Sequence, residues 1–428
     1  MSENREEQRQ RISLVGIGMG DRTSVTVRAG KIITSADCLI GAGRMLECAG
    51  RIADTEGKAL YQEYGAEKIA AFIREHPQYA HIAVVLSGDP GFYSGAKKLA
   101  QVLAKAGLCC DVRLVPGISS IAYLAAALGT SWEDGKIISL HGQDENFIQT
   151  VNRNRKTFFL LGGKDTGRRF LERFREFGMN DLTVSLGRNL SYPDEEIVSG
   201  RPEELDDTAA EGLCAAFVFN PHPEDYTAPH VADDAFIRGD VPMTKAEARA
   251  VSIAQLQPGQ DAVVYDVGAG TGSVSVEAAR CSDRIRVYAV EKKRAAVELL
   301  RKNRRKFCAD GIRIVEGEAP EALRDLEAPT HVFIGGSSGN LKEILRCVLE
   351  KNPQVRIVVN AISLETVGEV MAAAEEGLLK DPEIIQMNVS RSRKLGRYHM
   401  MTGLNPVYVI SAGGNPEKTC GNAKGKES

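Results

Sequence analysis

The stretch Tyr265-Asp266-Val267-Gly268-Ala269-Gly270-Thr271-Gly272 carries the strongest fold signal in the chain. The apolar run 262–265 predicts a buried strand, and residues 273–279 predict the helix that follows the turn. Three glycines alternate with other residues in this turn, where the missing Cβ lets a ligand approach the backbone closely. A strand, a glycine turn and a helix in this order predict a nucleotide-sized site at one edge of an α/β sheet.

The spacing of the glycines distinguishes two kinds of ligand. The dinucleotide fingerprint is Gly-x-Gly-x-x-Gly, whereas this turn reads Gly-x-Gly-x-Gly. S-adenosylmethionine has no diphosphate, and turn backbone together with a carboxylate such as Asp266 can meet its amino-acid end. A second acid, Glu291, follows the apolar strand 286–290, where it could bind ribose hydroxyls. The pattern therefore favours S-adenosylmethionine over an NAD site or a glycine turn without a ligand.

Length and composition describe an ordinary globular protein. At about 150 residues per domain, the 428 residues predict two or three domains. Hydrophobic residues make up 43% of the chain, and the net charge of −3 provides no global basic field for nucleic acid or membrane. Nine cysteines without a Cys-x-x-Cys pair favour reduced thiols in a cytoplasm and no metal site. We expect no signal peptide and no membrane span.

Strands and helices alternate from residue 12 to residue 128, which predicts a parallel α/β sheet in the first half of the chain. A strand at 213–219 is expected to end this half. Residues 220–240 contain three prolines and little periodicity, which is typical of a linker. A helix is expected at 244–256, with Thr244 as its N-cap and Glu247 as the capping-box partner. The expected boundaries are a domain at 11–222, a linker at 223–240, a domain at 241–412 and a disordered tail at 413–428.

Both halves resemble known enzyme families. The turns Val15-Gly16-Ile17-Gly18-Met19-Gly20-Asp21, Ser87-Gly88-Asp89-Pro90-Gly91 and Val115-Pro116-Gly117-Ile118-Ser119-Ser120 resemble the signature turns of the tetrapyrrole methylases. Residues 243–249, the Asp266 turn, residues 317–323 and residues 333–337 resemble the decarboxylating C15-methyltransferases of cobalamin biosynthesis. The two halves, in this order, resemble the family of bifunctional precorrin-6Y C5,15-methyltransferases (decarboxylating).

This resemblance implies a fold and a function. The fold is α/β, with an N-terminal two-lobed tetrapyrrole methylase (class III methyltransferase) fold and a C-terminal Rossmann-like class I methyltransferase fold. The implied activity is S-adenosyl-L-methionine-dependent methylation of a precorrin or cobalt-precorrin at C5 and C15, with decarboxylation of the C12 acetate side chain, in cobalamin (vitamin B12) biosynthesis. The implied partner is a tetrapyrrole substrate, without nucleic acid or membrane. The family also suggests a homo-oligomer, a tetramer formed through the C-terminal domain.

The resemblance also assigns cofactor contacts residue by residue. In the second half they fall on Thr244, Gly268, Ala269, Gly270, Thr271, Gly272, Glu291 and Ala319, and the turn itself adds Asp266 as described above. In the first half they fall on Ser87, Gly88, Asp89, Phe92, Ser119, Ser120 and Leu161. Gly20-Asp21 is followed by Arg22 and Thr23, where the wider family often has a proline, so the conformation of that loop stays open.

Four cations, Arg391, Arg393, Lys394 and Arg397, lie close together between the predicted strands 384–389 and 407–410. A substrate with many carboxylates needs cationic partners, and arginine binds carboxylates bidentately. We therefore expect this run to bind the substrate, with a solvated basic loop as the alternative.

Acid–base chemistry is not assigned to any residue. His141 and His399 could act as acid–base groups, or they could be packed or surface histidines without a role in catalysis.

Two other functions stay open. The chain could be an RNA methyltransferase, because both fold types include RNA-modifying members. The net charge of −3 weighs against this, as does Phe333-Ile334-Gly335-Gly336, where base-amino methylases carry an Asp/Asn-Pro-Pro-aromatic turn. Alternatively, one half could be an active methyltransferase and the other a non-catalytic binding module, although both halves have intact glycine turns. The sequence does not decide whether cobalt is present in the substrate or which carbon is methylated first.

Overall fold

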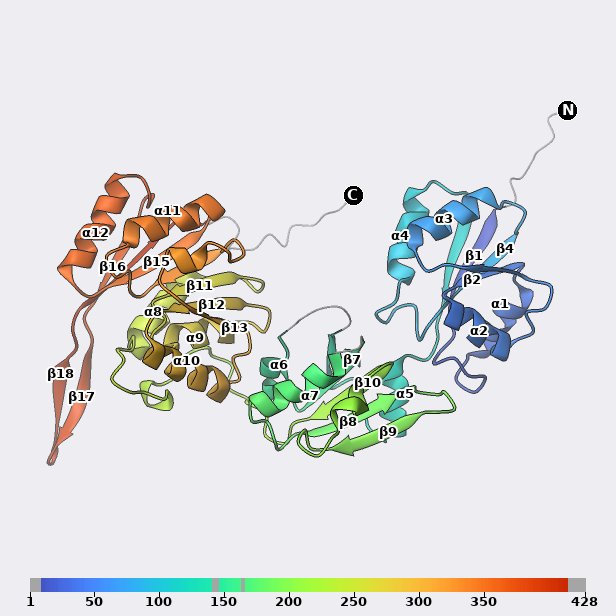
Figure 1. The fold of residues 1–428 in the computed structure, drawn as a ribbon, viewed down its shortest axis with the longest axis horizontal. Coiled ribbons are helices and arrows are strands. Elements are labelled where there is room, and N and C mark those ends of the chain that lie inside the picture. Colours follow the sequence, from blue (N-terminus) through green and yellow to red (C-terminus); the bar gives the residue numbers. More distant parts are fainter. Residues whose placement is uncertain (1–8, 141–145, 163–165, 415–428) are drawn as a thin grey trace. The chain divides into compact units, whose positions relative to one another are not determined.

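The computed structural model describes residues 9–140, 146–162 and 166–414 (Figure 1). The chain forms two compact units. Unit 1 lies within residues 1–144, 154–175 and 179–221, and unit 2 within residues 145–153, 176–178 and 222–428. Among the described helices, none is both long enough and apolar enough to cross a membrane.

The first sheet of unit 1 is parallel throughout, as the alternation of strands and helices predicts. Its strands are β1 (Gln10–Gly16), β2 (Cys38–Gly41), β3 (Ala59–Gln62), β4 (His81–Leu86) and β5 (Cys110–Val115), and its helices are α1 (Val27–Ser35), α2 (Gly43–Ile52), α3 (Ala66–Glu75) and α4 (Ala96–Lys105). The order is β3-β2-β4-β1-β5, so β1 is flanked by β4 and β5. Ile12 and Leu14 pack toward α3 and α4, whereas Val15 packs toward α1 and α2. Both faces are therefore covered, which explains why the apolar side chains of β1 are buried on both sides of the sheet.

The second sheet of unit 1 is mixed. Its elements are α5 (Ser120–Ala127), β6 (Lys136–Ser139), β7 (Lys156–Leu161), α7 (Thr166–Glu176), β8 (Thr183–Arg188), β9 (Glu196–Gly200), the 3-10 turn η1 (Asp207–Ala210) and β10 (Cys214–Phe219). The order is β6-β7-β10-β8-β9, with only β6 and β7 parallel. The strand expected at 213–219 is β10, and it lies in the centre of this sheet. Phe158 and Phe217 are fully buried against α5.

Unit 2 is built on a seven-stranded sheet. Its strands are β11 (Val263–Val267), β12 (Arg286–Glu291), β13 (Ile312–Glu316), β14 (His331–Ile334), β15 (Arg356–Ala361), β16 (Glu383–Met387) and β19 (Val407–Ala412). Its helical elements are α6 (Ile148–Arg153), η2 (Asp233–Ala235), α8 (Ala246–Leu256), α9 (Ser273–Arg280), α10 (Arg294–Lys306), η3 (Glu321–Leu323), α11 (Leu341–Lys351) and α12 (Leu364–Glu375). The strand order is β13-β12-β11-β14-β15-β19-β16, and β19 runs antiparallel to both of its neighbours, β15 and β16.

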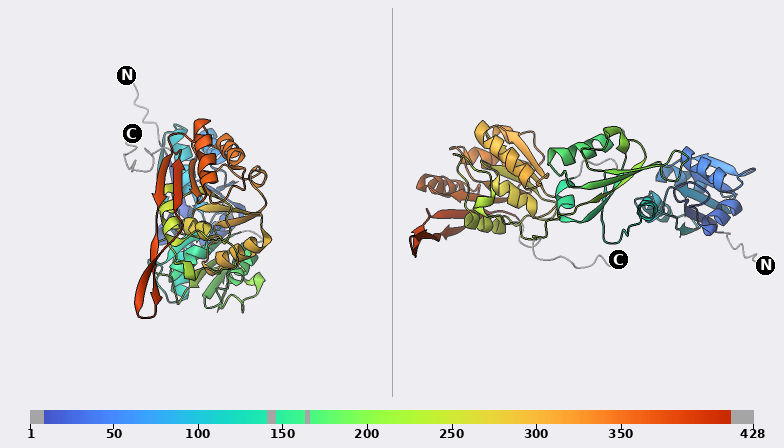
Figure 2. Two further views of the ribbon diagram at one scale, coloured as in Figure 1. Left: turned by 90° about the vertical axis from the view of Figure 1, so that its left-hand side faces the viewer. Right: turned by 90° about the horizontal axis from the view of Figure 1, so that it is seen from below.

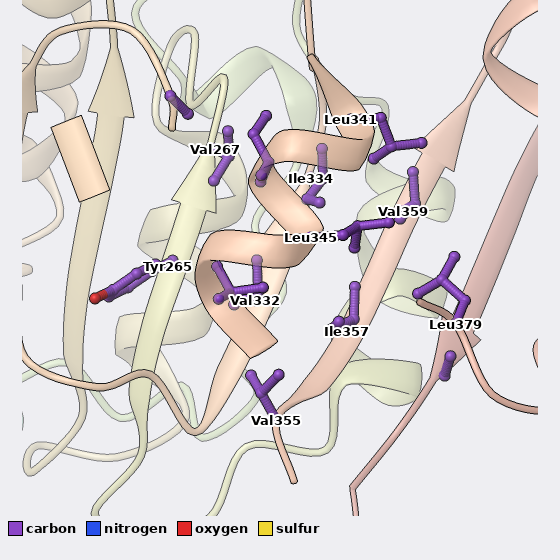
Figure 3. Packing of buried hydrophobic residues seen from close by; sticks show 14 of the residues in the cluster. Tyr265, Val267, Val332, Ile334, Leu341, Leu345, Val355, Ile357, Val359 and Leu379 are labelled. Atoms are coloured by element: carbon purple, nitrogen blue, oxygen red, sulfur yellow. The ribbon is translucent and has the colours of Figure 1, made fainter. Parts of the chain in front are cut away.

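The chain order of this sheet reverses between β11 and β14, which is where open α/β sheets bind ligands. One apolar layer lies between the sheet and helices α11 and α12, with Tyr265, Val332 and Leu345 among its buried residues (Figure 3). A second layer, which includes Val264 and Leu300, covers the other face. Because both faces of the sheet are buried, the carboxyl ends of its parallel strands are held in fixed positions along one edge of the sheet.

The segment that the sequence predicts as a linker, 223–240, makes ordered contacts with unit 2. Phe236 is 4% exposed and belongs to the second apolar layer. The backbone N–H of Ile237 donates to Asn303 Oδ1 at 2.8 Å. The tail expected at 413–428 lies outside the described residues from residue 415 onward.

The basic run expected as a connection forms a hairpin arm instead. Strands β17 (Ser390–Leu395) and β18 (Tyr398–Gly403) pair antiparallel as a hairpin (Figures 1 and 2). Every residue in both strands is exposed. They form a sheet of their own beside the seven-stranded sheet of unit 2. The sequence did not predict these strands because neither alternates apolar and polar side chains: β17 is mostly charged and polar, and the apolar side chains of β18, Tyr398, Met400 and Met401, lie on both of its faces.

Candidate active sites in the two units

In unit 2, Asp266 is the last residue but one of β11, so the strand extends beyond the apolar run 262–265 that the sequence predicts and includes Asp266. Its side chain is 1% exposed. Oδ2 accepts a hydrogen bond from Ser275 Oγ, and buried Oδ1 has no hydrogen-bond partner among the described residues. Burial raises the pKa of Asp266 to about 6, and the nearby charge of Glu291 adds to the effect. Oδ1 of this carboxylate can therefore accept a hydrogen bond from a ligand although it is buried.

The glycine turn after β11 needs its glycines. Gly268, Gly270 and Gly272 have φ angles of +75°, +56° and +78°, which favour glycine. A Cβ on Gly268 would lie 2.8 Å from the carbonyl oxygen of Gly336, at the end of β14. The N–H groups of Gly268 and Ala269 both donate to the carbonyl of Val290 at 3.0 Å, which fixes the turn against β12.

Glu291, the last residue of β12, is tied to the same turn. Its Oε2 accepts from the N–H of Gly270 at 2.9 Å, and its Oε1 accepts from the N–H of Lys293 at 2.8 Å. Each carboxylate oxygen can accept a further hydrogen bond, so the group can still bind hydroxyls. Thr271 Oγ1 is buried without a partner among the described residues, like Asp266 Oδ1. Two unsatisfied buried polar atoms at one turn call for a polar ligand or water, and they fit a cofactor with a charged amino-acid end.

Thr244 and Ala319 lie on segments next to this turn. A Cβ on Gly270 would lie 3.3 Å from the carbonyl of Pro242, which places the segment before α8 over the turn. The carbonyl of Ala319, after β13, accepts from Asn340 Nδ2 at 3.4 Å, which connects it to the start of α11. The predicted unit 2 contacts therefore come from the carboxyl ends of adjacent strands and from the segment that precedes α8.

The capping box predicted for α8 is wrong. The N-cap residue is Lys245, without a side-chain hydrogen bond at the cap, and the helix begins at Ala246. Glu247 forms ion pairs with Arg391, so its carboxylate is used elsewhere. The carbonyl of Thr244 accepts from Arg249 Nη1 at 2.5 Å, and this bond holds the chain just before the helix.

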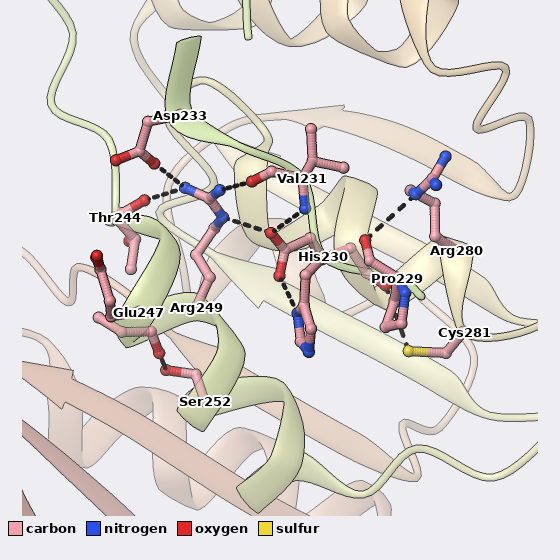
Figure 4. Close-up of polar contacts among 12 residues, drawn as sticks. Pro229, His230, Val231, Asp233, Thr244, Glu247, Arg249, Ser252, Arg280 and Cys281 are labelled. Carbon is pink, nitrogen blue, oxygen red and sulfur yellow. Dashed lines mark hydrogen bonds and ion pairs between the residues drawn. The ribbon is translucent and has the colours of Figure 1, made fainter. Parts of the chain in front are cut away.

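Sequence reasoning did not find the buried cluster around Arg249 (Figure 4). The Arg249 side chain is fully buried, with Nε 2.8 Å from Glu277 Oε1 and Nη1 2.7 Å from Asp233 Oδ1. Its Nη2 donates to the carbonyl of Val231. The only sequence signal is the position of Arg249 in the family-like run 243–249. Its two acids come from the expected linker and from α9, and no local pattern joins them.

In unit 1, the three signature turns meet at the carboxyl ends of β1, β4 and β5. Gly18 and Gly88 exchange backbone hydrogen bonds of 3.2 and 2.7 Å. A Cβ on Gly16 would lie 2.5 Å from the carbonyl oxygen of Gly88, and a Cβ on Gly117 would lie 2.2 Å from the same atom. Only glycine allows three backbones to approach so closely.

Asp89 joins two of these turns. Its Oδ1 accepts from the N–H of Gly91 at 2.7 Å, and its Oδ2 accepts from the N–H of Gly117 at 3.1 Å. A Cβ on Gly88 would lie 3.8 Å from Ser119 Cα, so residues 87–89 and the start of α5 at Ser120 lie together. The structure therefore brings together Ser87, Gly88, Asp89, Ser119 and Ser120.

The other two predicted contacts of unit 1 involve the second sheet. The ring of Phe92 lies 6.1 Å from the ring of Phe158 on β7. Leu161 is the buried last residue of that strand. Phe92 thus contacts β7 and Leu161 lies on it, whereas the three signature turns follow strands of the first sheet.

The structure also shows the conformation of the loop at Asp21. Its Oδ1 accepts from the backbone N–H groups of Thr23 at 2.5 Å and Ser24 at 2.6 Å. A proline at position 23 has no N–H and could not make the first bond. In this chain, which lacks the proline of the wider family, the loop therefore forms a turn that is closed by hydrogen bonds to the Asp21 side chain.

The four cations of the basic run have different surroundings. Arg391 Nε donates to Glu247 Oε1 at 2.8 Å, and Nη2 lies 3.0 Å from Asp233 Oδ2. Arg397 donates to the hydroxyl of Tyr398 at 2.7 Å. Arg393, Lys394 and His399 lie exposed on the hairpin arm, and His141 lies outside the described residues. The described residues contain no group of three or more His, Cys, Asp or Glu side chains able to hold a metal ion.

Comparison with known proteins identifies both halves. Residues 11–206 match the family of Tetrapyrrole (Corrin/Porphyrin) Methylases, and residues 234–412 match the Precorrin methyltransferase domain. A "Probable cobalt-precorrin-6B C(15)-methyltransferase (decarboxylating)" of Pyrobaculum calidifontis is 42% identical over 191 residues, which are 44% of this chain and 97% of the relative.

Two further relatives carry the name of a C5,15-methyltransferase. The precorrin-6Y C(5,15)-methyltransferase [decarboxylating] of a Sinorhizobium species is 25% identical over 418 residues, which are 94% of this chain and 95% of the relative. A crystal structure of precorrin-6Y C5,15-methyltransferase from Geobacter metallireducens aligns with a TM-score of 0.42 at 36% identity, over 44% of this chain and 99% of that one. From the sequence comparisons, the chain belongs to the family of precorrin-6Y C5,15-methyltransferases (decarboxylating), with a tetrapyrrole methylase domain before a Rossmann-like precorrin methyltransferase domain.

Proposed function

We propose that this protein uses S-adenosyl-L-methionine to methylate a precorrin or cobalt-precorrin at C5 and C15 and to remove the carboxyl group of the C12 acetate as CO₂, in cobalamin biosynthesis. The observation that carries the proposal is a pair of separate glycine-turn sites, one in each unit, in a chain that aligns along 94% of its length with a bifunctional relative. We assign C5 methylation to residues 11–222 and C15 methylation with decarboxylation to residues 241–412.

In residues 241–412, the cofactor would lie over the turn at 268–272. Asp266 Oδ1 and Thr271 Oγ1 are buried acceptors without a partner among the described residues, and they suit the charged amino-acid end. Glu291 is already fixed by the N–H of Gly270, so it is pre-oriented to accept from ribose hydroxyls. Thr244, in the segment before α8, and Ala319, in the segment after β13, would provide further contacts to the cofactor.

In residues 11–222, the cofactor would lie on the surface made by the three turns. Ser87, Gly88 and Asp89 would meet it from the end of β4, and Ser119 and Ser120 from the start of α5. Asp89 uses both of its oxygens on backbone N–H groups, so its role is to hold the turns in place. Phe92 and Leu161 would contact the cofactor from the side of β7.

When bound, S-adenosyl-L-methionine supplies an electrophilic methyl group on a cationic sulfur. The macrocycle carbon is already electron-rich, so the protein needs no strong base for the methyl transfer. Positioning the two reactants in line can contribute up to about 7–11 kcal/mol. The residues named above therefore act by binding, orienting and excluding water, and no side chain is assigned as an acid or base.

The substrate and the assembly belong to the same proposal. The acetate and propionate groups of a tetrapyrrole would bind cations of the hairpin arm, where Arg393, Lys394 and Arg397 are exposed to solvent. The protein would act in the cytoplasm as a homo-oligomer, a tetramer formed through the C-terminal domain, without nucleic acid or membrane as a partner.

The test is incubation of the full chain with S-adenosyl-L-methionine and candidate corrin precursors, with and without cobalt, followed by mass analysis of the product. The expected product has gained two methyl groups and lost one CO₂. A product with only one new methyl group would support the alternative with one non-catalytic half. Methylation of RNA without change in any corrin precursor would contradict the proposal.

A further inference from the structure

The hairpin arm and the cofactor turn of unit 2 are joined by a continuous chain of charged groups. We propose that Arg391 is a positioning residue that couples the β17–β18 arm to the cofactor turn through Asp233 and Arg249. This inference rests on the proposed function for the identity of the cofactor, and it gives Arg391 a different role from Arg393, Lys394 and Arg397.

The first link is the contact between the arm and α8. The Arg391 guanidinium, on β17, donates from Nε to Glu247 Oε1 at 2.8 Å and from Nη2 to Glu247 Oε2 at 2.5 Å. Glu247 lies in the first turn of α8. A two-pronged charged contact of this kind fixes orientation as well as distance. Arg391 thus fixes the orientation of the arm relative to α8 in addition to the backbone hydrogen bond from Leu404 to Val389 at the base of the hairpin.

The second link is Asp233, which is shared by two arginines. Its Oδ2 lies 3.0 Å from Arg391 Nη2, and its Oδ1 accepts from Arg249 Nη1 at 2.7 Å. The exposed fraction falls along this path, from 42% for the Arg391 side chain to 9% for Asp233 and 0% for Arg249. Hydrogen bonds strengthen as water is excluded, so the inner part of the path is the stiffer part.

The third link reaches the cofactor turn. Arg249 Nη1 also donates to the carbonyl of Thr244 at 2.5 Å, in the segment that lies over Gly270. Arg249 Nε donates to Glu277 on α9, the helix that follows the turn. A shift of Asp233 therefore changes the hydrogen bonding of Arg249, which holds both the Thr244 segment and α9.

Within one chain, and among the described residues, the other contact at the base of the arm is the hydrogen bond from the Leu404 N–H to the Val389 carbonyl at 2.8 Å. All residues of β17 and β18 are exposed, and an isolated two-stranded hairpin is at best marginally stable in water. Side chains alternate along β17, so Arg391 and Arg393 share one face, and the cross-strand partner of Arg393 is Met400. By holding its own side of the arm to α8, Arg391 sets the direction in which Arg393 is presented.

Coupling of this kind is reciprocal. If the contacts of Arg391 favour the conformation of the turn that binds the cofactor, then the cofactor favours the docked arm by the same factor. Such coupling is typically about fivefold or more in affinity. Loss of Arg391 should therefore weaken cofactor binding in unit 2, although Arg391 does not touch the cofactor site.

The experiment is hydrogen–deuterium exchange on the full chain, with and without S-adenosylhomocysteine, read at peptides spanning 390–403, 244–250 and 266–272. In the parent protein, the ligand should slow exchange at 266–272 and also in the arm. In Arg391→Ala, exchange in the arm should be faster and should no longer respond to the ligand. The affinity, read from the titration at 266–272, should fall about fivefold.

Arg393→Ala is the matched control, because it removes the same charge from the same face of the arm. It should keep the ligand-dependent protection of the arm and the parent affinity at 266–272. Glu247→Gln should behave like Arg391→Ala, and Arg391→Lys should restore only part of the protection, because lysine keeps the charge without the planar fork.

The outcomes separate the coupling from the cofactor assignment. Protection at 266–272 without any change in the arm of the parent protein would overturn the coupling and leave the cofactor site intact. Equal behaviour of Arg391→Ala and Arg393→Ala would also overturn it. Failure of the ligand to protect 266–272 would instead contradict the proposed function. In that case the two variants still test whether Arg391 holds the arm to α8. Faster hydrogen–deuterium exchange of the arm in Arg391→Ala than in Arg393→Ala would support this role, and equal exchange would refute it.

Discussion

The two units place an acid and a glycine turn at the carboxyl edge of a parallel sheet, but they use the acid differently. In unit 1, both oxygens of Asp89 accept backbone N–H groups, from Gly91 and Gly117, and the acid holds neighbouring turns together. In unit 2, Asp266 has one oxygen bonded to Ser275 and one buried oxygen without a partner among the described residues.

The glycines differ in the same way. In unit 1, Gly16 and Gly117 allow three backbones to approach one another, so the glycines serve the packing of the protein. In unit 2, one continuous turn has three positive φ angles, and a Cβ on Gly270 would meet no atom closer than 3.3 Å. Glycine is thus required for different reasons at different positions: Gly16 and Gly117 allow close approach of backbones, whereas Gly270 allows a positive φ beside open space. The comparison also predicts which unit responds to a given substitution.

The largest effect is expected for Gly117→Ala. Its Cβ would lie 2.2 Å from the carbonyl oxygen of Gly88, which is backbone and cannot swing away. We expect this change to destabilise unit 1 by about 1–3 kcal/mol or more and to abolish C5 methylation, while C15 methylation continues. Thermal unfolding and product mass check this. Gly30→Ala is the control, because its Cβ would meet no atom within 4 Å and alanine favours helix α1, so its activity and stability should match or exceed those of the parent.

The next effect is expected in the cofactor turn of unit 2. Gly270→Val forces a β-branched residue to a φ of +56°, and Asp266→Ala removes the buried acceptor. Each should abolish C15 methylation and decarboxylation and leave C5 methylation at the parent rate. Product mass separates the two activities in one sample. Loss of both activities in a folded variant would show that the units share one site or are tightly coupled.

The pH dependence of cofactor binding in unit 2 should follow Asp266. Its carboxyl has a pKa of about 6, and the cationic cofactor binds the ionised form, so affinity should fall about tenfold for each pH unit below 6 and stay level above it. Asp266→Asn should remove this dependence and weaken binding above pH 6. Exchange titrations at residues 266–272 across pH 5–8 check this, and an unchanged pH profile in Asp266→Asn would assign the titration to a group other than Asp266.

The same raised pKa predicts an opposite effect on stability. Because the folded pKa lies above the unfolded value of 3.8, the contribution of Asp266 to stability is present at pH values below 3.8 and is lost as pH rises through 6. At pH 7 the ionised group then costs the ligand-free protein about 3 kcal/mol. Asp266→Asn should therefore raise the unfolding temperature of unit 2 at pH 7 while it weakens cofactor binding. A lowered unfolding temperature would contradict burial as the cause of the raised pKa.

The smallest effect is expected on the exposed arm. Arg393→Ala with Lys394→Ala removes two solvent-exposed cations that we assign to substrate carboxylates. Exposed charge contacts contribute about 0.2–1 kcal/mol each, so the apparent affinity for the tetrapyrrole should fall a few-fold, with the affinity for the cofactor unchanged. Added salt should reproduce part of the loss in the parent protein. A double variant identical to the parent in both affinities would favour the solvated-loop alternative.

The sequence predicted the parts of each site that are local. The turn at 268–272 and the turns after β1, β4 and β5 follow from apolar runs broken by glycines, and the structure places them at sheet edges as expected. Contacts over long sequence distances could not be predicted. Arg249 can contact Asp233 and Glu277 only once α8, α9 and the segment before α8 have packed together.

Two local predictions failed or stayed incomplete for physical reasons. The capping box at Thr244 and Glu247 has the right residue types, but the carboxylate of Glu247 binds Arg391, and tertiary contacts override the local preference. The hairpin arm has no buried face, so its strands leave no periodic signal in the sequence.

The central claim is that each unit has its own cofactor site, and calorimetric titration of the intact chain with S-adenosyl-L-methionine tests it most directly. We predict a stoichiometry of two per chain for the parent protein. Gly270→Val and Gly117→Ala should each reduce it to one, by removing different sites. A stoichiometry of one for the parent chain would contradict the account.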